Sequence, residues 1–162
     1  MKPQDFIDTF LPFAKETEEK TGISAIAILA QAALESGWGE KAPGNMFFGV
    51  KAGKSENRQL ITTTEYSRRN DLKFPEIISV TKQPNGLYKY KVKDWFLKFD
   101  TPEECFSHHC KFFSDNPRYA EALDVRSDTY KFIDAIAKAG YATDPNYADL
   151  LKSIARSIEA RL

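Results

Sequence analysis

The sequence predicts an α+β fold in which a mainly helical lobe is interrupted by a small antiparallel β lobe. Apolar residues recur at helical spacing near both ends of the chain, whereas residues 58–99 alternate with a period of two. Within that middle segment, Asn85-Gly86 is the strongest short signal for a β-hairpin. We therefore expect a single domain, 1–162, with a helical lobe over about 1–57 and 100–162 and a β lobe over about 58–99.

Two helices are predicted before the sheet. The first covers residues 4–20, contains Pro12 as a potential kink and ends at Gly22. Its apolar positions at helical spacing are Phe6, Phe10 and Phe13. Ser24 is a suitable N-cap for the second helix, residues 25–36, because its hydroxyl oxygen accepts a hydrogen bond from a backbone N–H of the first turn.

The β lobe is predicted to contain three strands. The segments that predict them are QLITTTEY, EIISVTK and LYKYKVKDWFLKF, which are rich in β-branched residues or alternate with a period of two. Side chains alternate between the two faces of a strand, so Lys89, Lys91 and Lys93 share one face of the last strand. We interpret this lysine row as a solvated face.

Helical signals return after the sheet. N-cap residues, most of them followed by proline at the first helical position, mark four helix starts: Thr101-Pro102, Asn116-Pro117, Asp128 and Asp144-Pro145. The helix that follows Asp128 is expected to stop at Gly140, and the last helix is amphipathic to the end of the chain.

The charge and hydropathy of the chain argue against several classes of partner. Lys plus Arg and Asp plus Glu both number 23, so the formal net charge is zero and gives no long-range attraction for nucleic acid or an anionic membrane. No segment approaches the roughly 18 to 20 apolar residues of a membrane span. The N-terminal MKPQDFIDTF lacks a continuous apolar stretch, so no secretory signal is visible and we expect synthesis in the cytoplasm, as a monomer.

The cysteines and histidines suggest a metal site, which the spacing does not favour. Cys105 and Cys110 are five residues apart in a predicted helix and point about 140° apart, so we expect free thiols. Cys105 and His109 have the i, i+4 spacing of zinc ligands, but one helix cannot direct four ligands, His108 included, to one point. We therefore predict no metal and no cofactor.

Glu35 is the strongest candidate for a functional residue. The helix that contains it is apolar nearly all round, and only Gln31 and Glu35, one turn apart, break the pattern. Burial and the negative end of the helix dipole both disfavour an ionised carboxylate, so both raise its pKa, as a general acid near neutral pH requires. The alternative is a surface carboxylate, or one paired with a Lys or Arg from another element.

Five blocks of the sequence resemble, in order, the glucosaminidase domain of glycoside hydrolase family 73. They are AQAALESGWGE, NMFFGVKA, TTTEY, NPRYAEAL and AGYATDPNYADLLKSI, and they lie within about residues 20–158. Members of that family include bacterial autolysins, phage endolysins and the peptidoglycan-hydrolase domain of the flagellar rod-assembly protein. The resemblance implies a lysozyme-like fold and endo-β-N-acetylglucosaminidase activity on the glycan strands of peptidoglycan, without a cofactor.

The resemblance also implies catalytic roles for two carboxylates. The principal catalytic Glu of the family falls on Glu35, through LESGWG, and the second carboxylate falls on Glu65, through TTTEY. Glu35 would be the acid that protonates the leaving oxygen. Glu65 would activate water as a base, or would assist while the substrate's own 2-acetamido oxygen attacks. The segment SRRNDLKFPE adds a rival second carboxylate, Glu76.

Four further residues are candidates for substrate binding. The Tyr of the YATDP block falls on Tyr141, where the family lines its cleft. Asn45 and Phe48 follow the catalytic helix and are predicted to shape the cleft floor, although Phe48 equally suits the core. Trp38 offers an aromatic face for a sugar ring, and a buried hinge role is the alternative.

The predicted function is therefore a peptidoglycan hydrolase that cleaves the β-1,4 bond after N-acetylglucosamine. It would act on the cell wall or in the periplasm after phage-type release or specialised export, and the lysine row would be a second contact with the anionic wall polymer. One alternative is a muramidase or lytic transglycosylase of the same fold, which cuts the neighbouring bond. The other is a non-catalytic wall-binding or phage structural module.

Overall fold

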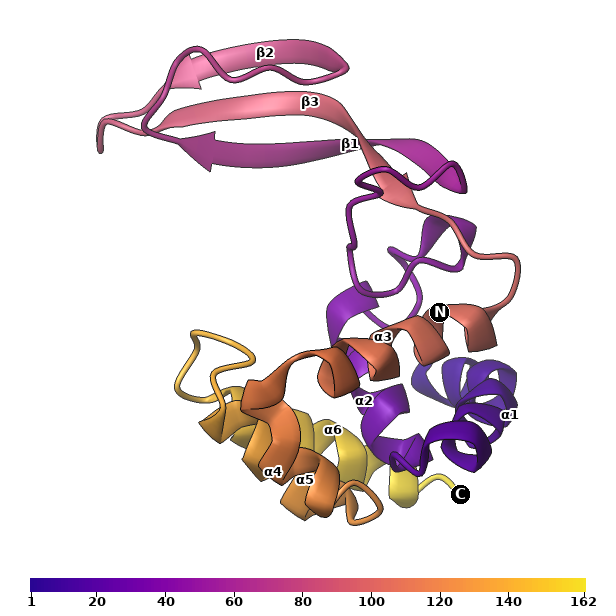
Figure 1. The fold of residues 1–162 in the computed structure, drawn as a ribbon. Helices are drawn as coiled ribbons and strands as arrows, with labels where there is room; N and C mark the ends of the chain where they lie inside the picture. Colours follow the sequence, from indigo (N-terminus) through magenta and orange to yellow (C-terminus); the bar gives the residue numbers. More distant parts are fainter. The chain divides into compact units, whose positions relative to one another are not determined.

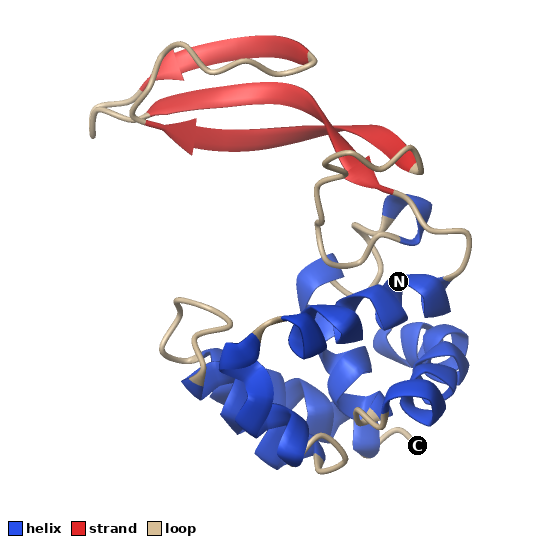
Figure 2. Ribbon diagram, viewed as in Figure 1, coloured by secondary structure: helices blue, strands red, loops and turns tan.

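Helices and strands separate along the chain into two units (Figures 1 and 2). The computed structural model describes residues 1–162; the helical unit contains residues 1–48 and 99–162, and the sheet unit contains residues 49–98. The helical unit holds six α-helices and two 3₁₀ helices, and the sheet unit holds three strands. This arrangement confirms the predicted α+β class.

The helices begin and end close to their predicted positions. They are α1 (Pro3–Thr21), α2 (Ala25–Ser36), η1 (Pro43–Asn45), α3 (Pro102–Asp115), η2 (Pro117–Tyr119), α4 (Ala120–Asp124), α5 (Thr129–Lys138) and α6 (Tyr147–Glu159). Helix α1 continues through Pro12. Helix α6 begins slightly later than predicted, at Tyr147 with Asn146 in the N-cap position.

Local signals explain where α2 begins and ends. The Ser24 hydroxyl accepts a hydrogen bond from the Ala27 N–H at 3.2 Å, and it also lies 2.6 Å from the Thr129 hydroxyl. Gly37 has a left-handed backbone, with φ 58°, and its N–H donates to the Ala33 carbonyl. The helix therefore has the predicted bounds.

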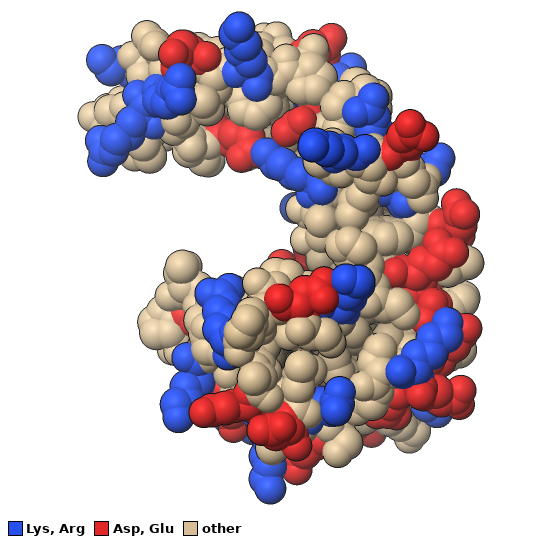
Figure 3. Space-filling view, in the orientation of Figure 1, with Lys and Arg blue, Asp and Glu red and all other residues tan.

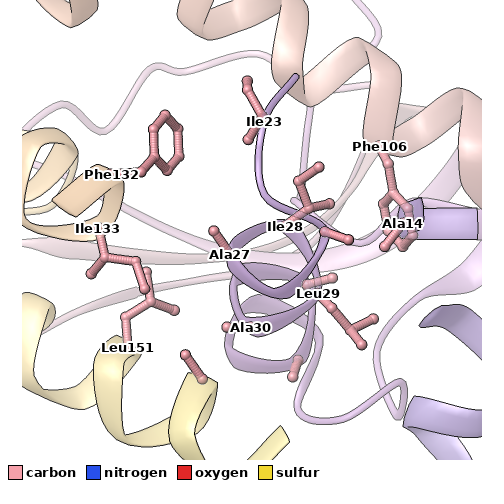
Figure 4. Packing of buried hydrophobic residues seen from close by; sticks show 14 of the residues in the cluster. Ala14, Ile23, Ala27, Ile28, Leu29, Ala30, Phe106, Phe132, Ile133 and Leu151 are labelled. Atoms are coloured by element: carbon pink, nitrogen blue, oxygen red, sulfur yellow. The ribbon is translucent and has the colours of Figure 1, made fainter. Parts of the chain in front are cut away.

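Helix α2 lies inside the hydrophobic core of the helical unit (Figure 4). The buried side chains labelled around it come from α1 (Ala14), the segment before α2 (Ile23), α3 (Phe106), α5 (Phe132 and Ile133) and α6 (Leu151). Neighbouring helices therefore meet α2 on several sides, which is why its sequence is apolar nearly all round.

The sheet unit contains one antiparallel sheet with the strand order β1-β3-β2. The strands are β1 (Arg58–Ser67), β2 (Glu76–Lys82) and β3 (Tyr88–Leu97). Strands β2 and β3 form the predicted hairpin, in whose loop Gly86 has φ 84° and Asn85 Oδ1 accepts a hydrogen bond from the Leu87 N–H at 3.0 Å. The lysine row lies on one face of β3, where its members are opposite Tyr66, Thr64 and Thr62 of β1.

The sheet unit begins earlier than the predicted β lobe. The Ala52 N–H donates to the Trp95 carbonyl, and the Leu97 N–H donates to the Val50 carbonyl, each at 2.9 Å. These backbone hydrogen bonds attach the segment before β1 to β3, so the unit starts at residue 49 rather than 58. Pairing of this kind leaves no periodic pattern in the sequence.

Charges of both signs are interspersed on the surface of each unit that is seen in Figure 3. This distribution agrees with the formal net charge of zero and presents no extended face of a single sign in that view. None of the helices combines the length and the apolar character that crossing a bilayer would require.

Candidate active site

Glu35 lies in the last turn of α2, and its side chain is exposed to solvent. This corrects the expectation of a buried carboxylate, because Ala32 and Ala33 take the positions that face the core. Glu35 forms no ion pair with a Lys or Arg. Nearby protein atoms nevertheless displace enough water from the carboxyl group to raise its pKa above the usual value. An accessible carboxyl group with a raised pKa suits proton donation to a bound substrate.

Gln31 lies one turn before Glu35 but is buried, with 1% of its surface exposed. Its amide nitrogen donates a hydrogen bond to the Tyr147 hydroxyl at 3.1 Å. Its amide oxygen lies 2.8 Å from Nε2 of His109. Gln31 and Glu35 therefore have different roles: Gln31 links three helices inside the unit, and Glu35 faces solvent.

His109 is held in the core by aromatic neighbours. Its ring stacks on Phe48, with centroids 3.8 Å apart and an interplanar angle of 11°, and meets the edge of Phe113 at 4.9 Å. Burial, with a smaller contribution from the charge of His108, lowers the pKa of His109 to about 3. The imidazole is therefore neutral, and since the Gln31 amide oxygen only accepts, Nε2 of His109 carries the proton.

Tyr141 and Tyr147 lie close enough to Glu35 for its charge to act on them, and Tyr119 packs beside Tyr141. The ring centroid of Tyr141 lies 5.5 Å from that of Tyr147 and 6.5 Å from that of Tyr119. Burial chiefly raises the pKa of both Tyr141 and Tyr147, and the negative charge of Glu35 raises each of them further. The Tyr119 hydroxyl is fully buried and has no hydrogen-bond partner. The structure thus brings Tyr141, a predicted substrate-binding residue, near the predicted acid.

The other predicted substrate-binding residues contribute to packing in the helical unit. The Trp38 ring is half-buried against the edge of Phe6, with centroids 5.5 Å apart, and its backbone has φ 56°. The Asn45 side-chain amide donates to the Phe99 carbonyl at 3.1 Å. Phe48 is half-buried on His109, as described above. Each side chain keeps a partly exposed surface, so binding of a sugar by these residues stays a prediction.

Glu65 lies on β1 and is ion-paired within the sheet unit. Its Oε1 lies 2.9 Å from Nζ of Lys51, which also lies 3.2 Å from Oδ2 of Asp94. The hydrogen bond from Lys51 to Glu65 is the largest of the effects that raise the pKa of Lys51. The sequence resemblance indicated Glu65 but neither of these neighbours. The structure adds Lys51 beside Glu65, and Asp94 on the other side of Lys51.

Glu76, the rival second carboxylate, lies on the opposite face of the sheet. It is opposite Lys93 in β3 and lies 3.4 Å from the Lys93 ammonium, whereas Glu65 is opposite Tyr90. Tyr90 and Lys93 are three positions apart, so their side chains point to different faces. The two carboxylates therefore cannot serve the same site on one face of the sheet.

Cys105 and Cys110 are free and buried, and burial raises the pKa of each thiol to about 12. Such thiols are poor metal ligands because coordination requires the thiolate. The structure contains no group of three or more His, Cys, Asp or Glu side chains arranged to hold a metal ion.

A separate open groove of about 730 Å³ lies in the helical unit, along η2, α4 and α5. Its lining includes Arg118, Lys131 and Lys138, and none of the predicted site residues. It is therefore not the candidate active site.

Sequence reasoning selected Glu35 as a candidate but missed the buried contacts made by its neighbour Gln31. Gln31 contacts His109, which is 78 positions away in the sequence, and Tyr147, which is 116 positions away. One signal was present, since Gln31 is a lone amide in an apolar helix. Tyr119 lies within NPRYAEAL, one of the five blocks, without having been singled out.

The neutral His109 gives a prediction for stability against pH. Its pKa is about 3 in the folded protein and about 6.5 in an unfolded chain, so only the unfolded chain binds the proton between these values. Stability is therefore lost as pH falls through that window, by at most about 1.4 kcal/mol per pH unit. We expect His109→Gln, which keeps an N–H donor, to lose less stability than the wild type between pH 7 and 4.5 in urea unfolding. Equal losses would contradict a neutral buried imidazole.

Comparison with known proteins gives a consistent picture. The sequence matches the glucosaminidase family, described as mannosyl-glycoprotein endo-β-N-acetylglucosaminidase, over residues 11–160. It is 31% identical to the peptidoglycan hydrolase FlgJ of Vibrio parahaemolyticus, in a match that covers 98% of this chain and 48% of the relative. The chain thus spans about half the length of the curated relatives that it matches.

The solved structures that resemble the fold include a glycoside hydrolase domain and the catalytic domain of an autolysin. The glycoside hydrolase domain of Salmonella typhimurium FlgJ is 31% identical, with a TM-score of 0.73, and the match covers 99% of this chain and 90% of that domain. The catalytic domain of the autolysin Auto from Listeria monocytogenes is 24% identical, with a TM-score of 0.72, covering 98% and 85%. At that identity the second likeness concerns the fold alone.

Proposed function

The chain belongs to the glucosaminidase family, and from that premise we propose that it is a peptidoglycan hydrolase that cleaves the β-1,4 bond after N-acetylglucosamine. The observation that carries the proposal is the carboxyl group of Glu35. This group is accessible to solvent, has no ion-pair partner and has a raised pKa, and the sequence resemblance through LESGWG assigns it the role of the family's principal catalytic Glu.

In the proposed reaction, Glu35 donates its proton to the glycosidic oxygen as the bond between that oxygen and the anomeric carbon breaks. The leaving sugar departs with a hydroxyl group, and positive charge develops on the N-acetylglucosamine ring. The ionised Glu35 then remains near that charge. Its raised pKa keeps a larger fraction of the carboxyl group protonated at neutral pH before each turnover.

The second half of the proposed reaction has two routes. In one, Glu65 accepts a proton from a water molecule, whose oxygen bonds to the anomeric carbon. In the other, the 2-acetamido oxygen of the substrate bonds to the anomeric carbon first and closes a five-membered ring. Water then bonds to that carbon and breaks its bond to the acetamido oxygen, while Glu65 assists. The Lys51 ammonium beside Glu65 supports either role, because it holds the carboxylate in position.

The test is to identify the ends of the glycan fragments that the protein releases. Purified sacculi are digested, the soluble products are reduced with borohydride, and the reduced sugar at each end is identified by mass spectrometry. We expect N-acetylglucosamine at the reduced ends, and a parallel digest with lysozyme supplies the reference for N-acetylmuramic acid ends.

Each alternative function gives a different result in this experiment. Reduced N-acetylmuramic acid ends would indicate a muramidase and overturn the proposed bond. Ends in the 1,6-anhydro form would indicate a lytic transglycosylase. Binding to sacculi without release of soluble fragments would indicate a non-catalytic module and overturn the enzymatic proposal itself.

A further inference from the structure

Gln31 is a buried amide that packing alone does not explain. Its surroundings in α2 are apolar, and an amide in such a place is costly unless both of its ends are hydrogen-bonded. Both ends are: the nitrogen to Tyr147 and the oxygen to His109. Hydrogen bonds therefore connect three buried polar groups in a row: His109 of α3, Gln31 of α2 and Tyr147 of α6.

The hydrogen bonds between His109, Gln31 and Tyr147 all run in one direction, from donor to acceptor. Nε2 of His109 donates to the Gln31 oxygen, because that oxygen has no proton to give. The Gln31 N–H groups then face the Tyr147 hydroxyl, which accepts one of them. Since the oxygen of Tyr147 accepts from Gln31, its own proton must point elsewhere.

The surroundings of Tyr147 indicate where that proton is useful. Gln31 and Glu35 lie one turn apart on the same face of α2, so the Tyr147 hydroxyl that bonds to Gln31 lies along the face that carries Glu35. Besides Gln31, the groups that act electrostatically on Tyr147 are the Glu35 carboxyl and the Tyr119 hydroxyl. The Tyr141 ring is tilted by 34° against the Tyr147 ring, with centroids 5.5 Å apart. No Lys or Arg acts on Tyr147 or pairs with Glu35. When Glu35 gives up its proton, the hydroxyl groups of Tyr147 and Tyr141, on which the charge of Glu35 acts, are able to stabilise the new negative charge.

We propose that Gln31 and His109 are positioning residues for the reaction at Glu35, because they orient the Tyr147 hydroxyl so that its proton is available to the carboxylate that forms. The proposal rests on the proposed function of Glu35. His109 is suited to the role because Phe48 and Phe113 fix its ring and it stays neutral, so it keeps one proton on Nε2 across the working pH range.

The test uses Gln31→Met, which keeps the volume of the side chain but removes the amide, together with Tyr147→Phe and the double variant. Loss of one hydrogen bond that stabilises a charged group corresponds to about a tenfold effect. We expect each single variant to lower kcat about tenfold with little change in KM, and the double variant to be no worse than either, because both act through the same proton.

The pH profile separates this role from a structural one. The oriented hydroxyl favours the ionised form of Glu35, so its loss raises the pKa of Glu35 and moves the alkaline limb of kcat/KM to higher pH. Gln31→Met, His109→Phe and Tyr147→Phe are expected to move that limb in the same direction. Thr17→Val is the matched control, since it removes another buried hydrogen bond, from the Thr17 hydroxyl to the Phe13 carbonyl, and is expected to change stability only.

Three results would overturn the proposal. The first is an unchanged alkaline limb in Gln31→Met and Tyr147→Phe, and the second is multiplicative losses in the double variant. The third comes from the wild type alone: ¹⁵N NMR of the His109 ring is expected to show the Nε2–H tautomer at neutral pH, and the Nδ1–H tautomer would reverse the direction of the hydrogen bonds. The NMR result does not depend on activity. It therefore distinguishes failure of the hydrogen-bond proposal from failure of the proposed function.

Discussion

Replacing Glu35 with Gln is expected to reduce the release of soluble glycan fragments by about 100-fold or more. The amide keeps the size and polarity of the side chain but cannot donate a proton to the glycosidic oxygen. General acid catalysis typically contributes about 10²- to 10⁴-fold, and no other acid on α2 lies within one turn of this position. Turbidity clearing of purified sacculi, with soluble reducing ends as the quantitative measure, follows the loss.

The same variant is not expected to lose stability. Glu35 has no ion pair to break, and its folded pKa lies above the value in an unfolded chain. A carboxyl group of this kind costs stability once the pH exceeds both values, because ionisation is less favourable in the folded protein. The amide removes that cost, so unfolding by urea at pH 7 should show equal or greater stability.

Glu19→Gln is the matched control for this prediction, since Glu19 is an exposed carboxylate on α1 with no ion pair. It should retain wild-type activity. Full activity in Glu35→Gln would show that Glu35 is not the acid, whatever the products of the wild type are.

Replacing Glu65 with Gln is expected to give the second large loss, about 100-fold if Glu65 activates water as a base. Stability should change little because Lys51 keeps its ion pair with Asp94. Glu76→Gln is the control on the other face of the sheet and should remain within about twofold of the wild type, as for a surface residue outside the site.

The size of the loss in Glu65→Gln also distinguishes the two routes. A loss of about tenfold or less would favour attack by the substrate's acetamido group, in which Glu65 only assists. The configuration of the first product, followed by proton NMR, gives an independent answer, since a single displacement by water inverts the anomeric centre and acetamido attack retains it. A large loss in Glu76→Gln with none in Glu65→Gln would identify Glu76 as the second carboxylate.

Short-range signals in the sequence were sufficient for the elements of the fold. Ser24 and Gly37 set the ends of α2, and Asn85-Gly86 forms the turn between β2 and β3, because each acts on a backbone only a few residues away. Hydrophobic periodicity then separated helices from strands and singled out Gln31 and Glu35 in α2. The ends of α2 and the turn between β2 and β3 could be predicted because the interactions that form them involve only neighbouring residues.

The tertiary structure decided how the polar groups are used. It exposed Glu35 where burial was expected, and it buried Gln31 between His109 and Tyr147, which are distant in sequence. It also placed Lys51 beside Glu65 by pairing the segment before β1 with β3. The direction of a hydrogen bond and the desolvation of a carboxyl group depend on atoms brought together by folding, and periodicity along the chain contains no record of them.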